Sequence, residues 1–279
     1  TPPDTVRYIL EKEKSSSLPY RVYSFAPDVS VLETKTCGKF TEYDSYILSR
    51  ALAEPNYAMP FGIDTLTGYD NFQPAVVTEI NAYLSQIKNT PTSSMDFSGR
   101  IRAMRNTLKM MNVKYIITYV DIHDTDFTLV YSTTTGRCEY KMHVYELRNY
   151  WPRYFLTGDT EQIGSKDGIF DTRSLSEMEK LTNTPRVYYA GNPLWSHPLD
   201  QGPAIILRPE TRNNTLLFEV GGGIKGKMLF VGNTYLPQWK AYVDTVEVLI
   251  QNVNYQHMAI YIPPGLHVVR FEYQQPFGF

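Results

Sequence analysis

The carboxy-terminal part of the chain alternates between apolar and polar residues in the manner of short antiparallel strands. Between positions 239 and 244, Trp239, Ala241 and Val243 can share one face, while the residues between them share the other. Successive side chains of a strand point to opposite faces, so this period of two predicts a half-buried strand. The pattern therefore places the indole of Trp239 toward an apolar core.

A Pro-Pro-Gly turn and a second alternating segment follow this strand. Pro264 and Gly265 suit the two central positions of a type II turn, because glycine tolerates the positive φ that the second position requires. Alternation resumes at 267–273, and further short strands are expected at 204–208, 215–220 and 227–231. Short strands at this spacing predict an all-β antiparallel sandwich.

The first half of the chain mixes helical and strand patterns. A helix is expected at 75–88, with Pro74 suited to its first turn. A second helix at 99–112 carries one apolar stripe, in which methionines are expected to fill the core. Residues 26–70 are rich in Pro, Gly, Asn and Asp and are expected to form loops around short strands. The remaining expected elements are a short helix at 3–13 and strands at 21–25, 114–119, 127–132, 143–147 and 153–157.

These patterns predict a fold in two parts. Residues 1–158 form an α+β or α/β domain, because helices and strands are mixed along it. Residues 159–201 form a connecting segment, whose prolines, glycines and aromatic residues suit a linker packed along a surface. Residues 202–279 form the sandwich, which we expect to resemble a carbohydrate-binding module.

Net charge, apolar runs and tyrosine content limit the classes of protein to which this chain can belong. A net charge of −2 gives no electrostatic reason to expect nucleic acid as a partner. No apolar run approaches the roughly 20 residues that span a bilayer, and the chain begins at Thr1, so it is expected to be a segment of a longer protein. The 22 tyrosines fit β-rich packing and equally fit surfaces that stack on sugars.

The two cysteines, Cys37 and Cys138, lack the spacing of a zinc or redox motif. A disulfide between them would close a loop of about a hundred residues and stabilise the fold by roughly 4–5 kcal/mol. Two buried thiols are equally compatible with the sequence.

Motif searches identify no catalytic residue, metal site or cofactor site. The glycine-rich stretch GGGIKGK, residues 221–227, lies between two expected strands, which favours a hairpin loop over a phosphate-binding loop. The stretch DIHDTD, residues 121–126, could supply oxygen ligands for a cation, but an acidic turn is the more common structure.

Candidate glycan-binding residues lie in two loops: Tyr69 and Asp70 in one, Trp151 and Arg153 in the other. Aromatic rings beside polar groups can stack on a sugar and hydrogen-bond its hydroxyls. The alternative is structural, with Asp70 capping a turn and Trp151 and Trp239 fixing loops to the core.

Four phrases occur in the order found in one bacterial protein family. They are LTGYDNFQP (66–74), MMNVKYIIT (110–118), VYELRNYWPRYFLTG (144–158) and the closing YLPQWKAYVD with NVNYQHMAIYIPPGLHVVRFEY. The chain resembles the soluble region of the YfhO-type membrane proteins. The positions that carry the closing signature are Trp239, Lys240, Asp244, Gly265 and His267.

Two residues depart from the family pattern. Gln238 stands where glycine is usual, and Thr245 stands where a turn glycine is common. The second departure argues against a type I′ turn after Asp244, because β-branched threonine resists positive φ.

The resemblance implies a parent protein that is a multi-spanning, GT-C-like glycosyltransferase using polyprenyl-phosphate sugars. It implies that this segment lies on the outer face of the bacterial cytoplasmic membrane and that the catalytic acid lies in the membrane part. The expected partners are then the membrane-spanning remainder of the chain and a cell-envelope glycan. The segment itself would bind the acceptor glycopolymer or cover the membrane domain.

Two other functions remain open from the sequence. The aromatic content and the terminal sandwich also fit a free-standing secreted carbohydrate-binding protein. A soluble glycoside hydrolase would need two carboxylates about 5–10 Å apart in a cleft, and the sequence nominates no such pair.

Overall fold

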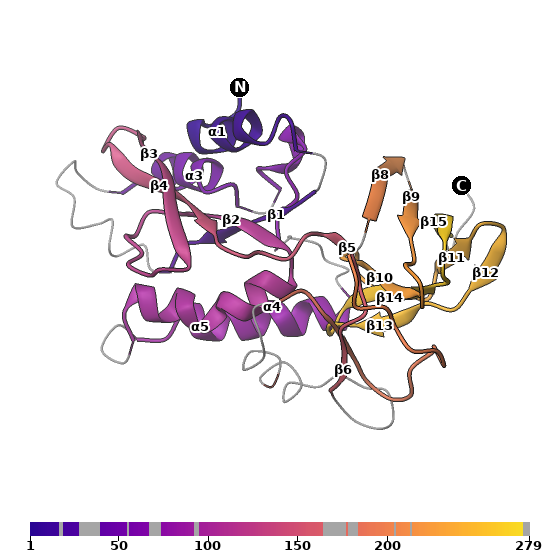
Figure 1. Ribbon diagram of the computed structural model, residues 1–279. Helices are drawn as coiled ribbons and strands as arrows, with labels where there is room; N and C mark the ends of the chain where they lie inside the picture. Colours follow the sequence, from indigo (N-terminus) through magenta and orange to yellow (C-terminus); the bar gives the residue numbers. More distant parts are fainter. Residues whose placement is uncertain are drawn as a thin grey trace. The chain divides into compact units, whose positions relative to one another are not determined.

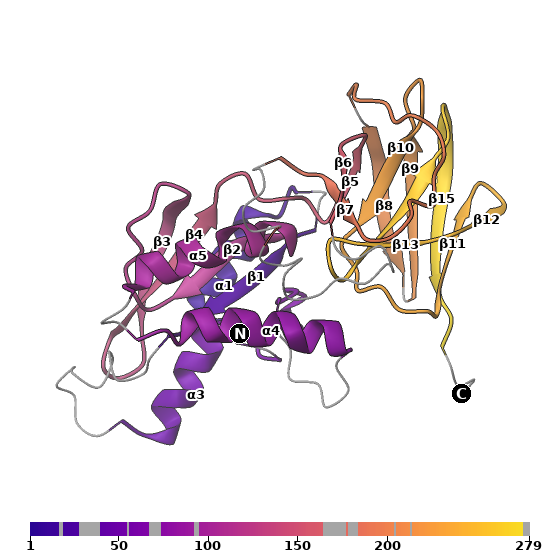
Figure 2. The ribbon, with the colours of Figure 1, turned by 90° about the horizontal axis from the view of Figure 1, so that it is seen from below.

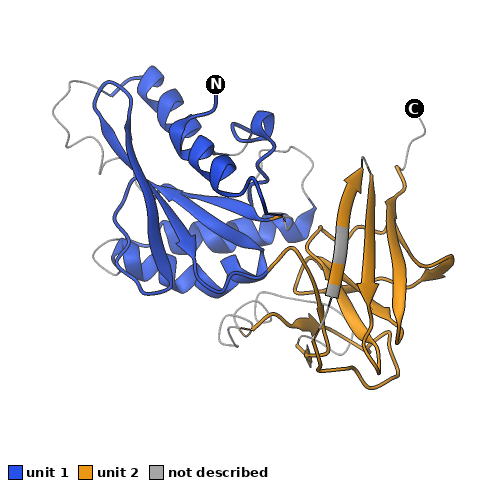
Figure 3. Ribbon diagram, turned by 45° about the horizontal axis from the view of Figure 1, so that its top comes forward, with its two compact units in different colours: residues 1–16, 20–151 blue, residues 17–19, 152–279 orange. Residues whose placement is uncertain are grey.

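A computed structural model of the chain describes residues 1–16, 19–27, 40–54, 56–66, 74–91, 95–163, 177, 184–203, 205–212 and 214–275. The chain divides into two compact units, shown in Figure 3. The first unit comprises residues 1–16 and 20–151, and the second comprises residues 17–19 and 152–279. The first combines helices with a sheet and the second is built from strands, which confirms the predicted fold class.

The first unit is a sheet with helices on both faces (Figure 1). Helices α1 and α3 lie on one side of the sheet, and α4 and α5 lie on the other. The strand order is β1-β2-β4-β3, in which β1 and β2 are parallel and the other pairs antiparallel. The helices are α1 (Asp4–Lys12), α3 (Glu42–Ala51), α4 (Ala75–Lys88) and α5 (Phe97–Met110), and the strands are β1 (Arg21–Phe25), β2 (Val113–Thr118), β3 (Phe127–Thr135) and β4 (Tyr140–Leu147).

Helices α4 and α5 follow the sequence prediction closely. Helix α4 has the predicted bounds, and α5 begins two residues earlier than predicted, because the Asp96 carboxylate caps it by accepting the Gly99 N–H at 2.6 Å. The predicted apolar stripe of α5 is buried, and its methionines fill the core as expected. That stripe consists of Ile101, Met104, Leu108 and Met111.

Helix α3 contradicts the prediction that residues 26–70 are irregular. It begins with a capping box, in which the Asp44 N–H donates to the Thr41 hydroxyl and the Thr41 N–H donates to the Asp44 carboxylate. The helix has few apolar residues, so its periodicity is weak in the sequence. Tertiary contacts stabilise it instead, since Asp44 is buried and receives two hydrogen bonds from the Arg137 guanidinium.

A buried carboxylate connects the end of α1 to β2. Glu13 Oε1 accepts hydrogen bonds from Lys114 Nζ at 2.7 Å and from the Tyr115 hydroxyl at 2.5 Å. The Lys114 ammonium also lies over the rings of Tyr20 and Tyr150, 5.7 and 5.1 Å from their centroids. Burial alone would raise the pKa of Glu13, but the hydrogen bonds from Lys114 and Tyr115 outweigh it and lower that pKa.

The second unit is a sandwich of two sheets (Figure 2), as the sequence predicted. Within each sheet every pair is antiparallel except β6 with β7. The six-stranded sheet has the order β5 (Tyr154–Thr157), β10 (Lys227–Val231), β14 (His257–Ile262), β13 (Gln251–Val253), β7 (Val187–Tyr189) and β6 (Thr160–Gln162). The five-stranded sheet has the order β12 (Val246–Val248), β11 (Trp239–Val243), β15 (Leu266–Tyr273), β9 (Thr215–Gly221) and β8 (Ile205–Arg212).

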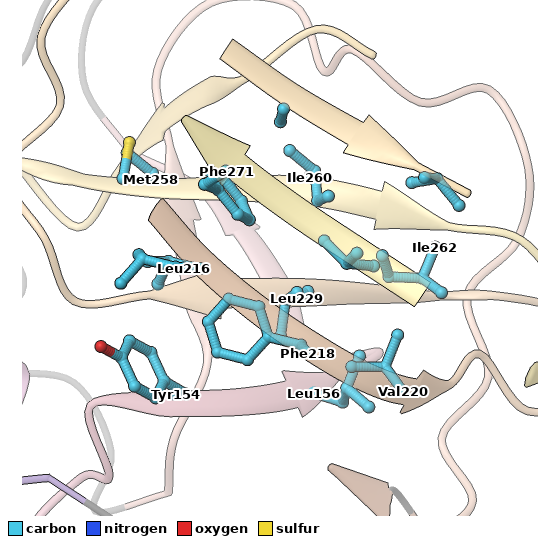
Figure 4. Packing of buried hydrophobic residues seen from close by; sticks show 14 residues of the cluster. Tyr154, Leu156, Leu216, Phe218, Val220, Leu229, Met258, Ile260, Ile262 and Phe271 are labelled. Atoms are coloured by element: carbon cyan, nitrogen blue, oxygen red, sulfur yellow. The ribbon is translucent and has the colours of Figure 1, made fainter. Parts of the chain in front are cut away.

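The core of the sandwich lies between the sheets (Figure 4). Phe218 is central to it, because its ring meets Tyr154 and Phe271 edge to face at 4.9 and 6.2 Å. Ala241 and Val243 are buried in this core, and the partly buried ring of Trp239 packs against it. The inward face predicted for β11 is therefore confirmed.

The observed units differ from the predicted domain boundaries. Strand β5, expected to end the first domain, pairs with β10 in the second unit. Strands β6 and β7, within the expected connector, belong to the same sheet. The physical reason is that these three strands satisfy their backbone hydrogen bonds by pairing with each other or with strands of the sandwich.

Trp239→Ala should lower the free energy of unfolding by about 2 kcal/mol, because only part of the ring leaves solvent. Phe271→Ala, at a fully buried position, should cost about 3–5 kcal/mol. Urea unfolding of the whole chain followed by circular dichroism measures both. A cost for Trp239→Ala equal to that of Phe271→Ala would contradict the packing described.

Glu13→Gln should lower the free energy of unfolding by about 3 kcal/mol near pH 7, because it leaves the Lys114 ammonium without its carboxylate. The lowered pKa of Glu13 means that this stabilisation is present above its ordinary value of 4.5 and is lost as pH falls through the folded-state pKa. Thermal unfolding from pH 7 to pH 3 should show the two proteins converging. The matched control is Glu11→Gln, an exposed glutamate in the last turn of α1, which Glu13 caps. Parallel curves for Glu13→Gln and wild type would refute the assignment.

Candidate functional site

Of the four candidate glycan-binding residues, only Trp151 and Arg153 belong to the described part of the chain. Tyr69 and Asp70 lie outside the described residues. Trp151 is only 2% exposed, so its ring face is covered, and its backbone carbonyl accepts a hydrogen bond from Asn112 Nδ2. Arg153 is half-buried at the start of the sandwich, where its carbonyl accepts the Gly232 N–H at 2.8 Å. Trp151 thus takes the structural role that was the alternative prediction.

Three of the signature residues, Asp244, Gly265 and His267, come together at one end of the five-stranded sheet, whereas Trp239 and Lys240 lie toward the other end of β11. Asp244 Oδ1 accepts the Val268 N–H at 3.0 Å, and Oδ2 lies 2.9 Å from His267 Nδ1. His267 Nε2 lies 3.2 Å from the Pro264 carbonyl oxygen, and Gly265 between them has φ +111°. Both partners of the imidazole are acceptors, which favours its doubly protonated form. The hydrogen bond to Asp244 accordingly raises the pKa of His267 and lowers that of Asp244.

The hydrogen bonds of Asp244 and His267 fix the turns on either side of them, and we call these two residues the turn lock. The two-residue connection between β11 and β12 has positive φ at Asp244 alone, which fits the expectation that Thr245 disfavours a type I′ turn. Lys240 extends the same hairpin through a 2.5 Å ion pair with Glu247. Asp244, Gly265 and His267 therefore stabilise turns, Lys240 stabilises the β11–β12 hairpin, and Trp239 packs against the core.

The acidic stretch DIHDTD is divided among separate partners. Asp124 pairs with Arg102 at 2.5 Å, and Asp126 pairs with Arg105 at the same distance. Asp121 lies 3.3 Å from His143. The carboxylates therefore face different side chains, and no group of three or more His, Cys, Asp or Glu among the described residues is arranged to hold a metal ion.

His143 also contacts Ser132, whose hydroxyl lies 2.8 Å from Nδ1. The three residues resemble a nucleophilic triad, but the order around the ring differs from that of serine hydrolases, because the carboxylate faces Nε2 and the serine faces Nδ1. Ser132 and His143 are direct cross-strand partners of β3 and β4, and Asp121 is 70% exposed. We assign the group to cross-strand pairing.

The glycine-rich stretch GGGIKGK connects the two sheets, which corrects the predicted hairpin. It joins β9 of one sheet to β10 of the other, and these strands do not pair. The carboxylate of Asp200 accepts the Ile224 N–H at 2.7 Å and the Gly202 N–H at 2.8 Å. A Cβ at Gly223, whose φ is +70°, would approach Asp200 Oδ2 to 2.1 Å, so only glycine fits there.

The chain segment 190–201 crosses the outer face of the six-stranded sheet. The Leu194 N–H donates to Gln251 Oε1 on β13 at 2.9 Å, and the His197 ring lies 6.0 Å from that of Tyr261 on β14. Asp200 ends the crossing, and Lys227 Nζ, 1% exposed, donates to the carbonyls of Asp200 and Gly202 at 2.7 Å each. The expectation of a linker packed along a surface agrees with this path.

A pocket of about 240 Å³ opens between this segment and the sheet. Leu194 and Leu249, which are 50% and 73% exposed, stand at its rim. The Trp195 ring is held by an edge-to-face contact with Tyr189 at 5.0 Å. The lining residues that matter for recognition are Leu194, Trp195, Met228, Leu249, Gln251 and Tyr261.

The pocket combines aromatic walls with one fixed amide. Tyr261 donates its hydroxyl hydrogen to the Lys225 carbonyl oxygen at 3.3 Å, so the ring forms a wall. Gln251 Oε1 is occupied by the Leu194 N–H, and Nε2 has no hydrogen-bond partner among the described residues. None of the described residues that line the pocket is charged. Such a surface can stack on a flat apolar face and donate a hydrogen bond beside it.

Sequence reasoning missed this pocket. Trp195 and Gln251 are 56 positions apart, and neither belongs to a motif. A tryptophan between prolines in an irregular segment was the one available signal, since such a ring must find a surface to cover.

The pKa of His267 should lie above its ordinary value of 6.5, and Asp244→Asn should bring it down. Because the folded-state pKa is raised, the pair's contribution to stability is present below pH 6.5 and is lost as pH rises through the folded-state pKa. NMR titration of the His267 ring protons measures the pKa directly. A value at or below 6.5 in the unmodified chain would contradict the turn lock.

Comparisons with models of protein families, with curated proteins and with solved structures find no match for this chain. Among the helices of the described residues, none has the length and apolar character to cross a membrane.

Proposed function

We propose that the chain is a non-catalytic extracytoplasmic domain of an integral membrane glycosyltransferase-like protein, and that its second unit binds a glycan. The parent protein would act in cell-envelope glycopolymer glycosylation. The proposal combines the four ordered YfhO-type phrases with the pocket at Trp195. The pocket is the observation that carries the binding function.

The chemistry of the pocket fits a sugar better than it fits a charged or purely apolar ligand. A pyranose has one face of C–H groups, which stacks on an indole, and a rim of hydroxyls, which need hydrogen-bond partners. Trp195 offers the first contact and the Gln251 amide offers the second. A purely apolar ligand would leave the Gln251 N–H groups without an acceptor.

The state of the cysteines supports a location outside the cytoplasm. Cys138 is disulfide-bonded, and Cys37, the other cysteine of the sequence, lies outside the described residues. Disulfides persist in oxidising compartments and are rare in the cytosol. The proposed partners are the membrane-spanning remainder of the same chain and a glycan of the cell envelope.

A free-standing secreted carbohydrate-binding protein is the second candidate, favoured by the same pocket and the same disulfide. The two candidates predict different coding sequence on either side of this region of the gene. Membrane-spanning segments encoded next to this region would support the first, and a complete reading frame without them would support the second.

Trp195→Ala should weaken glycan binding by roughly tenfold or more, because it removes the stacking surface. A glycan array probed with the whole chain, followed by calorimetry on the best ligand, measures the change. Trp239→Phe is the matched control, since it alters a tryptophan of the same unit outside the pocket. Equal binding by the Trp195→Ala variant and the unmodified chain would locate the glycan site elsewhere.

A further inference from the structure

We propose that the Trp195 pocket takes a single uncharged pyranose ring, with one ring hydroxyl accepting a hydrogen bond from Gln251 Nε2. The inference rests on the proposed glycan-binding function and names the class of sugar. It follows from the volume of the pocket, the absence of charge in its lining and the fixed orientation of the Gln251 amide.

The volume limits the ligand to one ring. Sites for drug-sized ligands enclose roughly 300–1,000 Å³, and this pocket encloses about 240 Å³. Its rim is apolar, because Leu194 and Leu249 are largely exposed there. One sugar can therefore enter the pocket, and the rest of a glycan would continue past this rim.

The uncharged lining disfavours a charged sugar. A carboxylate or phosphate that loses its water needs a cationic partner, and the lining residues that the structure describes carry no charge. Lys225 contributes its backbone carbonyl to Tyr261, but its side chain is not part of the lining. Uronic acids and phosphorylated sugars should consequently bind more weakly than their neutral counterparts.

The orientation of the Gln251 amide provides the polar selectivity. Oε1 of Gln251 accepts the Leu194 N–H at 2.9 Å. This hydrogen bond holds the amide with Nε2 directed away from the Leu194 N–H. Gln251 is only 9% exposed, so its amide is largely shielded from water. A site that donates to a hydroxyl discriminates strongly against a ligand that lacks it, since the donor is then left unpaired.

Gln251→Glu tests the donor without removing the anchor. Glutamate keeps an oxygen for the Leu194 N–H and replaces the N–H groups with a second acceptor oxygen. Gln274→Glu is the matched control, because Gln274 is exposed outside the pocket and the change in charge is the same. Circular dichroism and thermal unfolding establish that each variant is folded.

The experiment is saturation-transfer NMR and calorimetry of the whole chain with a panel of neutral methyl pyranosides and the matching methyl uronides. We expect at least one neutral pyranoside to bind, and its uronide to bind roughly tenfold more weakly or worse. Gln251→Glu should weaken the neutral ligand by a similar factor, while Gln274→Glu leaves it unchanged.

Three outcomes would overturn the inference. If a uronide binds as well as its neutral counterpart, the charge argument fails while glycan binding stands. If Gln251→Glu binds like the unmodified chain although Trp195→Ala does not, the hydrogen bond is misassigned. If neither single pyranosides nor the glycan array shows binding, the proposed function fails together with the inference.

Discussion

Burial of strand β10 on both of its faces is the constraint on which the second unit depends. All five of its residues are buried, with Leu229 and Val231 in the core between the sheets. Phe230 is buried as well and stacks on Phe155 at 4.4 Å. An antiparallel sheet usually leaves one face to water, so a strand apolar on both faces requires a second cover. The segment 190–201 provides that cover over part of the sheet.

Polar contacts fix the end of the segment 190–201, and they thereby fix the wall that this segment gives to the pocket. The Asp200 carboxylate accepts the Ile224 N–H of the glycine-rich connection, whose Gly223 leaves room for it, and Lys227 Nζ donates to the Asp200 carbonyl. Between this clamp and the hydrogen bond from Leu194 to Gln251, the segment carries Trp195 over the sheet. Because the segment is anchored on both sides of Trp195, the fold itself positions the indole.

Local patterns identified many elements but not their long-range contacts. Helix α4 and strand β10 have the predicted bounds, because the apolar residues that they bury lie within each element's own length: Ile80 and Leu84 in α4, and 228–231 in β10. Helix α3 was missed because its stability comes from the Thr41–Asp44 capping box and from Arg137, 93 residues away from Asp44. The burial of Trp151 could not be predicted for a related reason, because an aromatic residue in a loop sequence carries no sign of what covers it.

The sequence by itself determined the division into a mixed α+β part and an all-β part and the inward face of Trp239, Ala241 and Val243. Only the tertiary structure decided that β5, β6 and β7 join the sandwich and that Trp195 meets Gln251 and Tyr261 in one pocket. The periodicity of a segment records whether its side chains are buried. It does not record which distant segment buries them, because sheet order and surface crossings arise from contacts between residues far apart in the chain.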